Sequence, residues 1–422
     1  MKKKLLVLGG TIASLDVVRV AQNMGVTVFV ADDQDEGVSK SIADFDVKIS
    51  TTDHNALLKY IKDNEIDGVF CGPSEFNLQN CMKVCELAGF PFYFTPEQWE
   101  VCSNKKKFKE LCDKFNVPRV KDYEIEGDVT LADLSNIEYP VIVKPVDGAS
   151  SRGISVCYNV DELRNAYDFA LRESKLKEVL VEHYIDNNGV GLSARYIICD
   201  GKYYLSLVGD RYVVNAKEGQ ALIGASAFFP SKYTDDYIEH INENAIRMFK
   251  ALGIRNGTLF MQALIEDDNI YFHEMGLRLS GGLTYKMTED ILGVNDLKMM
   301  IRYALGLPLC TQEEKQRISP YLDGKYAGSL SIPLKPGIIS KIVGVEKIKK
   351  LKGIVDFTQY YQNGSEIDDR MIGTLMQLFG RIKITCDSKR EFVTLVNNIH
   401  EILEIRDQYD TDMIYARYQP VF

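Results

Sequence analysis

The chain has 422 residues, of which 45% are hydrophobic. This length and apolar content predict two to four domains, each with a real hydrophobic core. The formal net charge of −10 argues against a nucleic-acid surface spread over the whole protein. The apolar runs are too short for a membrane span. Nine cysteines without framework spacing indicate reduced thiols in a cytoplasmic protein.

Residues 1–98 alternate short apolar strands with helical segments. This order predicts a parallel sheet with crossover helices, in an N-terminal α/β domain. The glycine pair Gly9-Gly10 matches part of a dinucleotide-binding fingerprint, but Ser14 stands where the third glycine is needed. Glu75 follows the third expected strand, at the edge where open sheets bind ligands. It is therefore a candidate for substrate binding, and an ordinary acid at a helix start is the alternative.

The segment Tyr139–Tyr158 reads as two apolar strands joined by a loop of small residues. Glycine and serine let backbone N–H groups and hydroxyls approach an anion closely. Lys144 ends the first strand, where its ammonium group would face the same anion. The segment predicts either a lid over nucleotide phosphates or a surface hairpin, and by itself it does not separate the two.

A second hairpin is expected at Gly257–Gly282, with its turn near Asp268. That turn places Gln262 opposite Glu274, and alternation along the strand adds Arg278 to the same face. The flanking apolar residues predict that this polar strip is partly buried, and a buried polar strip needs a partner. A cation bound together with phosphate would provide one, and a solvated strand face is the alternative.

Three further helices are expected, at Trp99–Asn116, Asp161–Lys175 and Thr234–Leu252. The first of them carries Lys105 near its start. After Leu309 a polar stretch reads as a linker. Residues 320–422 are then expected to form a third, α+β module with one helix near Ser388–Glu404.

With these segments in place, the chain resembles the ATP-grasp superfamily, in the branch of biotin carboxylase, carbamoyl-phosphate synthetase and the carboxylate–amine ligases. Four motifs in the family's order carry the resemblance: Asn104-Lys105 before Pro118, Lys144 with the loop 147–153, Glu182–Ile185, and the strip of Gln262, Glu274 and Arg278. The resemblance covers essentially the whole chain. It implies an ATP-grasp fold of mixed α/β and α+β class, with an N-terminal parallel α/β domain at 1–98, an ATP-grasp domain at 99–310 including a lid subdomain at about 117–182, and a C-terminal strand-rich domain at 320–422.

The resemblance also implies the residues of the site. Lys105 and Lys144 would reach the ATP phosphates. Gln262 and Glu274 would hold Mg²⁺, with Mn²⁺ as an alternative ion. Arg278 and Lys144 would serve catalysis. The ATP-binding positions carried over from the family are Lys105, Lys144, Ser150, Ser151, Gly153, Glu182, His183, Ile185 and Leu264.

In this pattern Glu182 would accept the amino group of adenine. Three other positions depart from the pattern. Gly276 stands where the family usually has an asparagine metal ligand, Leu192 where a second glutamate is usual, and His273 where an aliphatic residue commonly lies beside the adenine. These departures bear on the second metal ion and on the ribose contacts, and they leave both lysines and the rest of the strip unchanged.

The implied function is an ATP-dependent, ADP-forming ligase that joins a carboxylate to an amine (or a thiol) through an acyl phosphate. Two alternatives stay open: a carboxylase acting through carboxyphosphate, and an ATP-binding protein that has lost its chemistry. The expected partners are small-molecule carboxylates and amines, without nucleic acid or membrane, and a homodimer is common in this branch. Glu75, Arg195, Arg211 and Tyr285 are candidates to line the substrate pocket, although each arginine also reads as a solvated strand residue.

Overall fold

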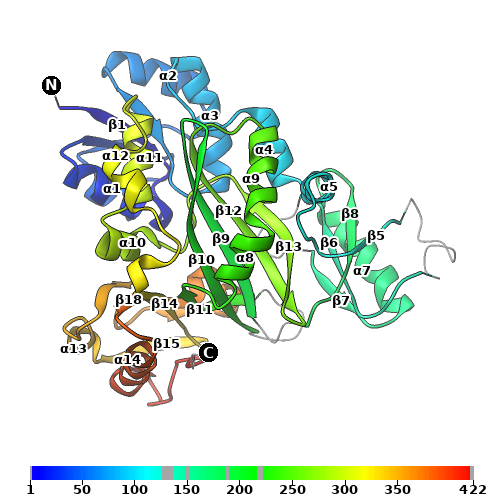
Figure 1. Cartoon of the computed structure of the whole chain (residues 1–422). Helices are drawn as coiled ribbons and strands as arrows, with labels where there is room; N and C mark the ends of the chain where they lie inside the picture. Colours follow the sequence, from blue (N-terminus) through cyan, green and yellow to red (C-terminus); the bar gives the residue numbers. More distant parts are fainter. Residues whose placement is uncertain (1, 126–135, 148–152, 187–189, 216–221, 419–422) are drawn as a thin grey trace.

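The computed structural model of the protein describes residues 2–125, 136–147, 153–186, 190–215 and 222–418. Figure 1 shows a body built on one large sheet, with the N-terminal sheet against one end of it, a lid sheet standing to the side and a C-terminal layer below. The class is mixed α/β and α+β, as the sequence predicts.

The N-terminal sheet is parallel, with the strand order β3-β2-β1-β4. Its elements are β1 (Lys4–Leu8), α1 (Ile12–Asn23), β2 (Thr27–Ala31), the 3-10 turn η1 (Lys40–Ile42), β3 (Phe45–Val47), α2 (His54–Asp63), β4 (Gly68–Phe70) and α3 (Glu75–Ala88). The predicted parallel sheet is confirmed. The strand order reverses between β1 and β4, so Gly9 and Glu75 flank the point where such sheets tend to bind ligands. Asp32 is used within the sheet, because its carboxylate accepts the backbone N–H of Gly10 at 2.7 Å.

The helix predicted at Trp99–Asn116 is two helices, and this part of the prediction is wrong. They are α4 (Pro96–Ser103) and α5 (Lys105–Phe115). Asn104 separates them with extended backbone, and its side chain accepts the N–H groups of Lys106 and Lys107. Asparagine competes with helical hydrogen bonding in this way. Lys105 consequently becomes the first residue of α5, at a helix end that favours anions.

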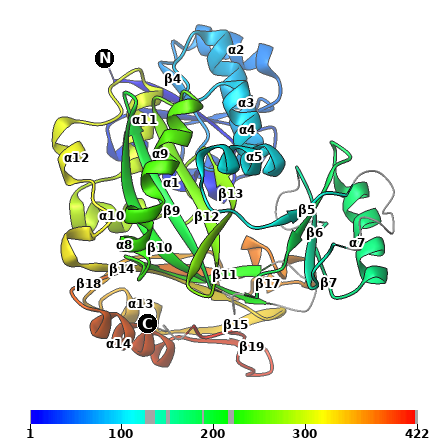
Figure 2. The ribbon, with the colours of Figure 1, turned by 45° about the vertical axis from the view of Figure 1, so that its right-hand side comes forward.

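A small antiparallel sheet stands away from the body (Figure 2), and we call it the lid because it coincides with the predicted lid subdomain. Its strand order is β5-β8-β6-β7, and its elements are β5 (Asp122–Tyr123), β6 (Val141–Pro145), β7 (Ser155–Cys157), α7 (Val160–Glu173) and β8 (Val179–His183). The helix α7 agrees within two residues with the predicted Asp161–Lys175 and buries Leu163, Ala166 and Ala170 in the lid core. Its start is capped by Asn159, whose side chain accepts the N–H of Glu162.

The large sheet has eight antiparallel strands in the order β13-β12-β9-β10-β11-β14-β18-β16. The strands are β9 (Val190–Cys199), β10 (Lys202–Asn215), β11 (Leu222–Phe229), β12 (Gly257–Glu266), β13 (Asn269–Gly276), β14 (Tyr326–Pro333), β16 (Ile354–Gln359) and β18 (Leu378–Cys386). The hairpin predicted at Gly257–Gly282 is confirmed, because β12 and β13 pair and turn at Asp267-Asp268. β9 and β10 form another hairpin, with its turn at Asp200-Gly201.

The large sheet continues from the central part of the chain into the C-terminal part. β14, β16 and β18 come from residues after 320 and extend the sheet that carries β12 and β13. The stretch after Leu309, predicted as a linker, contains the helix α12 (Gln312–Arg317), which starts with a capping box formed by Thr311 and Glu314. The division of the chain into domains near 310–320 stays a prediction.

The remaining elements pack beside the large sheet and below it. They are α8 (Thr234–His240), α9 (Asn242–Ala251), α10 (Tyr285–Leu292), α11 (Asp296–Ala304), η2 (Leu322–Gly324), β15 (Gly337–Val343), α13 (Val345–Ile348), β17 (Glu366–Ile367), η3 (Asp369–Met371), η4 (Leu375–Gln377), α14 (Lys389–Ile402) and β19 (Glu404–Asp407). The predicted helix Thr234–Leu252 is divided at Ile241 into α8 and α9. The C-terminal helix is confirmed as α14, with Ser388 as its cap.

The C-terminal layer depends on a close contact between Gly328 of β14 and Phe392 of α14. A β-carbon at position 328 would lie 2.1 Å from Cε2 of Phe392, which is fully buried. We expect Gly328→Ala to lower the free energy of unfolding by about 1–3 kcal/mol through overpacking, as measured by urea denaturation. Gly224→Ala on the neighbouring strand β11 is the matched control, because nothing lies within 4 Å of a β-carbon there. Equal stability of the two variants would contradict this packing argument.

Candidate active site

Charged side chains from separate elements share one electrostatic environment beside the lid. Lys105 starts α5, Lys144 lies on β6 and Glu274 lies on β13. Burial lowers the pKa of the Lys105 ammonium group, and the charge of Lys144 lowers that pKa further. The negative charges of Glu274, Glu182 and Glu75 raise the same pKa. The structure therefore brings these lysines and acids around one site.

Glu274 is a carboxylate surrounded by cations. Burial raises the pKa of Glu274, but the charges of His273, Arg211, Lys105 and Lys144 outweigh burial and lower it. The contribution of His273 requires a protonated ring, and burial lowers the pKa of His273 to about 4. Near neutral pH the two lysines and Arg211 therefore keep Glu274 ionised, as a metal ligand requires.

Gln262 and Glu274 are direct partners in the register of β12 and β13, as predicted. A bulge follows Gln262, and the pairing resumes one residue out of register at Ala263 and Phe272. One amide and one carboxylate form the small ligand set that Mg²⁺ takes when phosphate and water complete its shell. In the described parts of the chain there is no group of three or more His, Cys, Asp and Glu side chains placed to hold a metal ion. The pair therefore fits an ion that arrives with phosphate.

An aromatic ring from the facing strand fills the space beside Gly276. Phe260 is the register partner of Gly276, and a β-carbon on Gly276 would lie 2.3 Å from Cζ of Phe260. The guanidinium carbon of Arg278 lies 4.9 Å from the centre of the same ring, within cation–π range. The chain thus supports Arg278 with an aromatic ring at the position where the resemblance would place an asparagine ligand.

Arg278 is also joined to the N-terminal sheet. Its Nε and Nη2 atoms both donate to Oε1 of Glu75, at 3.0 and 2.8 Å. Its Nη1 donates to the carbonyl of Leu279 at 3.0 Å. The Glu75 side chain is 48% exposed, so a bound molecule can reach this ion pair. The candidate substrate residue Glu75 and the candidate catalytic residue Arg278 are therefore in contact.

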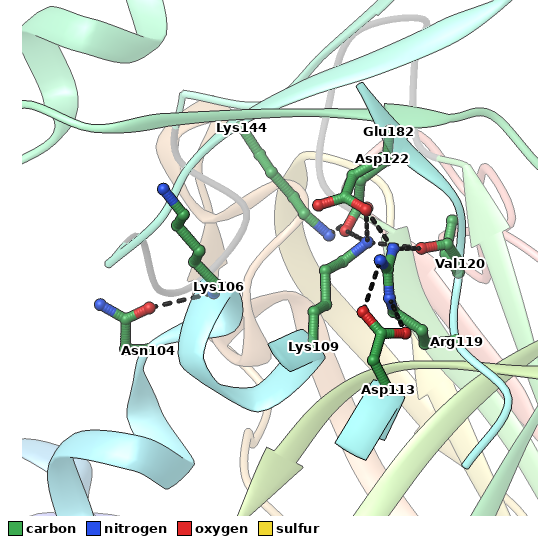
Figure 3. A network of polar contacts seen from close by, with 9 residues as sticks. All are labelled: Asn104, Lys106, Lys109, Asp113, Arg119, Val120, Asp122, Lys144 and Glu182. Atoms are coloured by element: carbon green, nitrogen blue, oxygen red, sulfur yellow. Dashed lines mark hydrogen bonds and ion pairs between the residues drawn. The ribbon is translucent and has the colours of Figure 1, made fainter. Parts of the chain in front are cut away.

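Two lysines hold the carboxylate of Glu182 (Figure 3). Nζ of Lys144 lies 2.5 Å from Oε2, and Nζ of Lys109 lies 2.8 Å from Oε1. The predicted acceptor of the adenine amino group is thus an ion-pair partner in this structure. Lys109 is absent from the predicted site. Its one signal in the sequence is a lysine placed between Phe108 and Cys112 on the buried face of α5.

The predicted phosphate loop is described only at its ends. Ser150 and Ser151 lie outside the described residues. Gly153 has φ of 74°, a backbone conformation that glycine adopts readily. A β-carbon on Gly153 would lie 2.7 Å from Cγ of Pro145. The end of the loop therefore packs closely on the strand that carries Lys144.

The other predicted adenine positions lie on β8, just after it and on β12. Nε2 of His183 lies 3.1 Å from Oε1 of Glu266. Ile185 is buried. Leu264 pairs with Tyr271 across the hairpin of β12 and β13. The contact between His183 and Glu266 joins the lid to the large sheet on this side of the site.

The loop after β13 is held by two cations from β18. Nζ of Lys383 donates to the carbonyl of Gly282 and to Oγ of Ser329, both at 2.6 Å. Nη1 of Arg381 donates to the carbonyl of Gly281 at 2.6 Å. Lys383 is fully buried, and burial together with the charge of Arg381 lowers its pKa well below the ordinary value. Neither cation is in the predicted site, although both lie in a strand whose other residues are mostly apolar.

Lys286 connects three parts of the fold beside this loop. Its Nζ lies 3.0 Å from Asp16 of α1 and 3.1 Å from Asp356 of β16. The hydroxyl of Tyr285, a candidate pocket residue, donates to Asp16 at 2.7 Å. The start of α10 is thereby tied to the N-terminal sheet and to the C-terminal part of the large sheet.

A cavity of about 10 Å³, the size of one water molecule, lies behind the same loop. Arg195, Thr284 and Asp296 contribute to its lining. Arg195 donates to Oγ1 of Thr284 through Nη1. Nε of Arg195 and Oδ1 of Asp296 are buried and have no hydrogen-bond partner among the described residues. Burial lowers the pKa of Arg195 to about 10, so this arginine supports the loop and is not a solvated strand residue.

The carboxyl group of Asp296, whose Oδ1 is buried, predicts a specific pH dependence of stability. Burial raises its pKa from 3.8 to about 6. A group whose pKa is higher in the folded protein than in the unfolded chain stabilises the folded state when it is protonated. This stabilisation is fully present at a pH below the pKa in the unfolded chain and is lost as the pH rises through the pKa in the folded protein. Asp296→Asn mimics the protonated carboxyl. We therefore expect its stability relative to the parent protein to increase from about pH 4 to about pH 7, by up to about 3 kcal/mol.

Urea denaturation of both proteins across this pH range measures the difference. Asp168→Asn, at an exposed position of α7, is the matched control and should show no such trend. A stability difference between Asp296→Asn and the parent that stays constant over the range would contradict the raised pKa.

Residues 104–312 match the family described as the carbamoyl-phosphate synthase L chain, ATP binding domain. A curated relative is a formate-dependent phosphoribosylglycinamide formyltransferase from Sulfurisphaera tokodaii. It is 24% identical over 400 residues, which cover 93% of this chain and 96% of the relative.

Two solved structures share the fold. The L-amino acid ligase from Bacillus licheniformis has a TM-score of 0.78 at 21% identity, covering 96% of this chain and 99% of the ligase. The biotin carboxylase domain dimer of Hydrogenobacter thermophilus 2-oxoglutarate carboxylase, in complex with MgADP, ADP and bicarbonate, has a TM-score of 0.76 at 20% identity, covering 98% and 91%. Every helix in the described ranges is too short or too polar to cross a membrane.

Proposed function

The chain belongs to the ATP-grasp superfamily, and we propose that it is an ATP-dependent, ADP-forming ligase that joins a carboxylate to an amine through an acyl phosphate. The observation that carries the proposal is the shared electrostatic environment of Lys105, Lys144 and Glu274. The protonated form of Lys105 is disfavoured by burial and by the charge of Lys144. A polyanion bound between these lysines relieves that repulsion, and a triphosphate carrying Mg²⁺ has the required charge.

The residues of the strip fit a magnesium–nucleotide substrate. Gln262 and Glu274 would hold the ion, which neutralises charge on the transferring phosphoryl group when it is bound. Lys105 and Lys144 would hold the phosphates, with Ser150, Ser151 and Gly153 over them. Glu182, His183, Ile185 and Leu264 would surround the adenine. Mn²⁺ also accepts carboxylate and carbonyl oxygens and is the alternative ion.

Arg278 is placed to stabilise the oxyanion that forms when an amine attacks the acyl phosphate. Its two donors to Glu75 are the pair that a carboxylate or an oxyanion of a substrate would accept. A substrate that takes this place releases the Glu75 carboxylate, which can then accept a hydrogen bond from the neutral amino group of the acceptor. Phe260 keeps the guanidinium plane supported during the exchange.

The names of the similar proteins support this class of reaction. One relative is a formate-dependent formyltransferase, and one structural neighbour is an L-amino acid ligase. The neighbour with bound bicarbonate supports carboxylation through carboxyphosphate as the second candidate. ADP release that depends on bicarbonate and needs no amine would distinguish a carboxylase from a ligase.

The proposed setting is a reducing compartment, the cytoplasm. All nine cysteines are buried and free, which suits an environment that keeps thiols reduced. A homodimer is the proposed assembly, because the similar biotin carboxylase domain is described as a dimer.

A phosphate-release screen tests the function directly. The purified chain is incubated with ATP, Mg²⁺ and a matrix of carboxylates and amines. We expect ADP and phosphate in amounts that depend on both members of a matching pair. Binding of MgATP without phosphate release from any pair would favour a nucleotide-binding protein that has lost its chemistry.

Removal of the guanidinium group should impair turnover. We expect Arg278→Ala to lower kcat by ~100-fold or more, because an oxyanion donor contributes about 2.7–4 kcal/mol to the transition state. Steady-state ADP release with the matching substrate pair measures kcat. Arg247→Ala, at an exposed arginine of α9, is the matched control. A value for Arg278→Ala within about threefold of the parent would remove Arg278 from the mechanism.

Loss of the metal-binding carboxylate should change the magnesium requirement. We expect Glu274→Gln, which keeps the size of the side chain, to raise the Mg²⁺ concentration for half-maximal ADP release by roughly tenfold or more, because a neutral amide binds Mg²⁺ more weakly. Glu401→Gln, at an exposed position of α14, is the control. An unchanged magnesium titration for Glu274→Gln would exclude Glu274 as a ligand.

A further inference from the structure

Lys109 is a buried lysine with a fixed set of partners. It lies on α5 and is 1% exposed. Its Nζ donates to the carbonyl of Val120 at 2.6 Å and lies 2.8 Å from Oε1 of Glu182. Asp122 lies 4.0 Å from the same nitrogen. Figure 3 shows this ammonium group enclosed between β8, the entry to the lid and α5.

Glu182 is as deeply buried as Lys109. The residue is 2% exposed, and its second oxygen lies 2.5 Å from Lys144. Burial raises the pKa of Glu182, while the charges of Lys144 and Lys109 outweigh burial and lower it. A buried carboxylate that loses its partners is strongly unfavourable. If a ligand draws one lysine away from Glu182, the other lysine must therefore stabilise the buried carboxylate.

The two lysines differ in what lies on their other side. Lys144 is close enough to Lys105 and Glu274 for its charge to act on both, so it borders the proposed phosphate site. Lys109 is bound on its far side by the Val120 carbonyl, which belongs to the protein itself. Lys144 can exchange Glu182 for an anion, whereas Lys109 is held in place.

We propose that Lys109 is a positioning residue that stays on Glu182 while Lys144 leaves for the phosphates of ATP. The inference rests on the proposed function. It adds that both Lys109 and Lys144 pair with the adenine-binding carboxylate of Glu182 in the protein without nucleotide. Nucleotide binding then breaks the pair with Lys144 and keeps the pair with Lys109. Oε2 of Glu182, released by Lys144, then accepts the amino group of adenine. Oε1 remains on Lys109, so the carboxylate stays charged and oriented.

Lys109 also connects this exchange to the lid. Val120 lies two residues before β5, and its N–H donates to the carbonyl of Phe272 on β13 at 3.0 Å. Lys109 thus binds one strand of the lid through Glu182 and the entry to the lid through Val120. The same ammonium group sets the position of β8 relative to α5 while Lys144 changes partners.

The test is nucleotide binding by the full chain, measured by calorimetry with MgATP and with MgGTP. We expect Lys109→Met to bind MgATP at least tenfold more weakly and to lose at least tenfold of the preference for ATP over GTP. The second effect follows because a Glu182 that becomes protonated can donate to the 6-oxo group of guanine. Lys114→Met, an exposed lysine at the other end of α5, is the matched control.

A pH series separates positioning from a general loss of structure. In Lys109→Met, departure of Lys144 leaves a buried carboxylate without a cation, so MgATP binding must take up a proton. Binding by this variant should become tighter, relative to the parent, as the pH falls from about 8 to about 6. The added Glu182→Gln substitution should abolish this trend. If Lys109→Met unfolds, the double variant Lys109→Met/Glu182→Gln is compared with Glu182→Gln instead. The two should bind MgATP with nearly equal affinity, because the side chain at position 182 is already neutral in both.

The outcomes are distinguishable. Failure of the parent protein to bind MgATP overturns the proposed function and this inference with it. Parent binding together with a Lys109→Met variant of unchanged affinity, ATP preference and pH dependence overturns the role of Lys109 alone. A uniform loss of affinity with the purine preference and pH dependence unchanged also overturns it, because that result assigns Lys109 to structure only.

Discussion

Like charges held close together around one site are the constraint on which the rest of the structure depends. Lys105, Lys109 and Lys144 come from α5 and the lid, and the buried carboxylate of Glu182 and the half-buried carboxylate of Glu274 lie among them. Burial disfavours the charged forms of Lys105, Lys109, Glu182 and Glu274, so each of them needs a group of opposite charge nearby. Lys109 and Lys144 form ion pairs with Glu182, and Lys105 and Glu274 lie close enough for their charges to act on the same groups.

A helix break and the pairing of strands in the large sheet position these groups. The break at Asn104 makes Lys105 the first residue of a helix. The shared sheet extends the hairpin of β12 and β13 into the C-terminal strands, which places Arg381 and Lys383 under the loop after β13. The loop carbonyls are therefore held by the C-terminal part of the chain, and the site is assembled from both ends of the large sheet.

The departure at Gly276 is accompanied by a change on the opposite strand. The ring of Phe260 lies where a side chain at position 276 would be, and Arg278 stacks on it. A chain with asparagine at position 276 could not keep this ring in place. The aromatic support for Arg278 and the glycine at position 276 are thus two aspects of one packing arrangement.

The sequence by itself determined what depends on neighbouring residues: the alternation that makes a parallel sheet, the turn at Asp267-Asp268 that pairs Gln262 with Glu274, and the class of the fold. It also singled out Lys105 and Lys144 as cations of interest. Only the tertiary structure decided that Glu182 is held by Lys109, that Arg195 and Asp296 share a cavity, and that Lys383 supports a loop a hundred residues away. The physical reason is that the ionisation and role of a buried group depend on its partners, and those partners come from distant segments that no local pattern specifies.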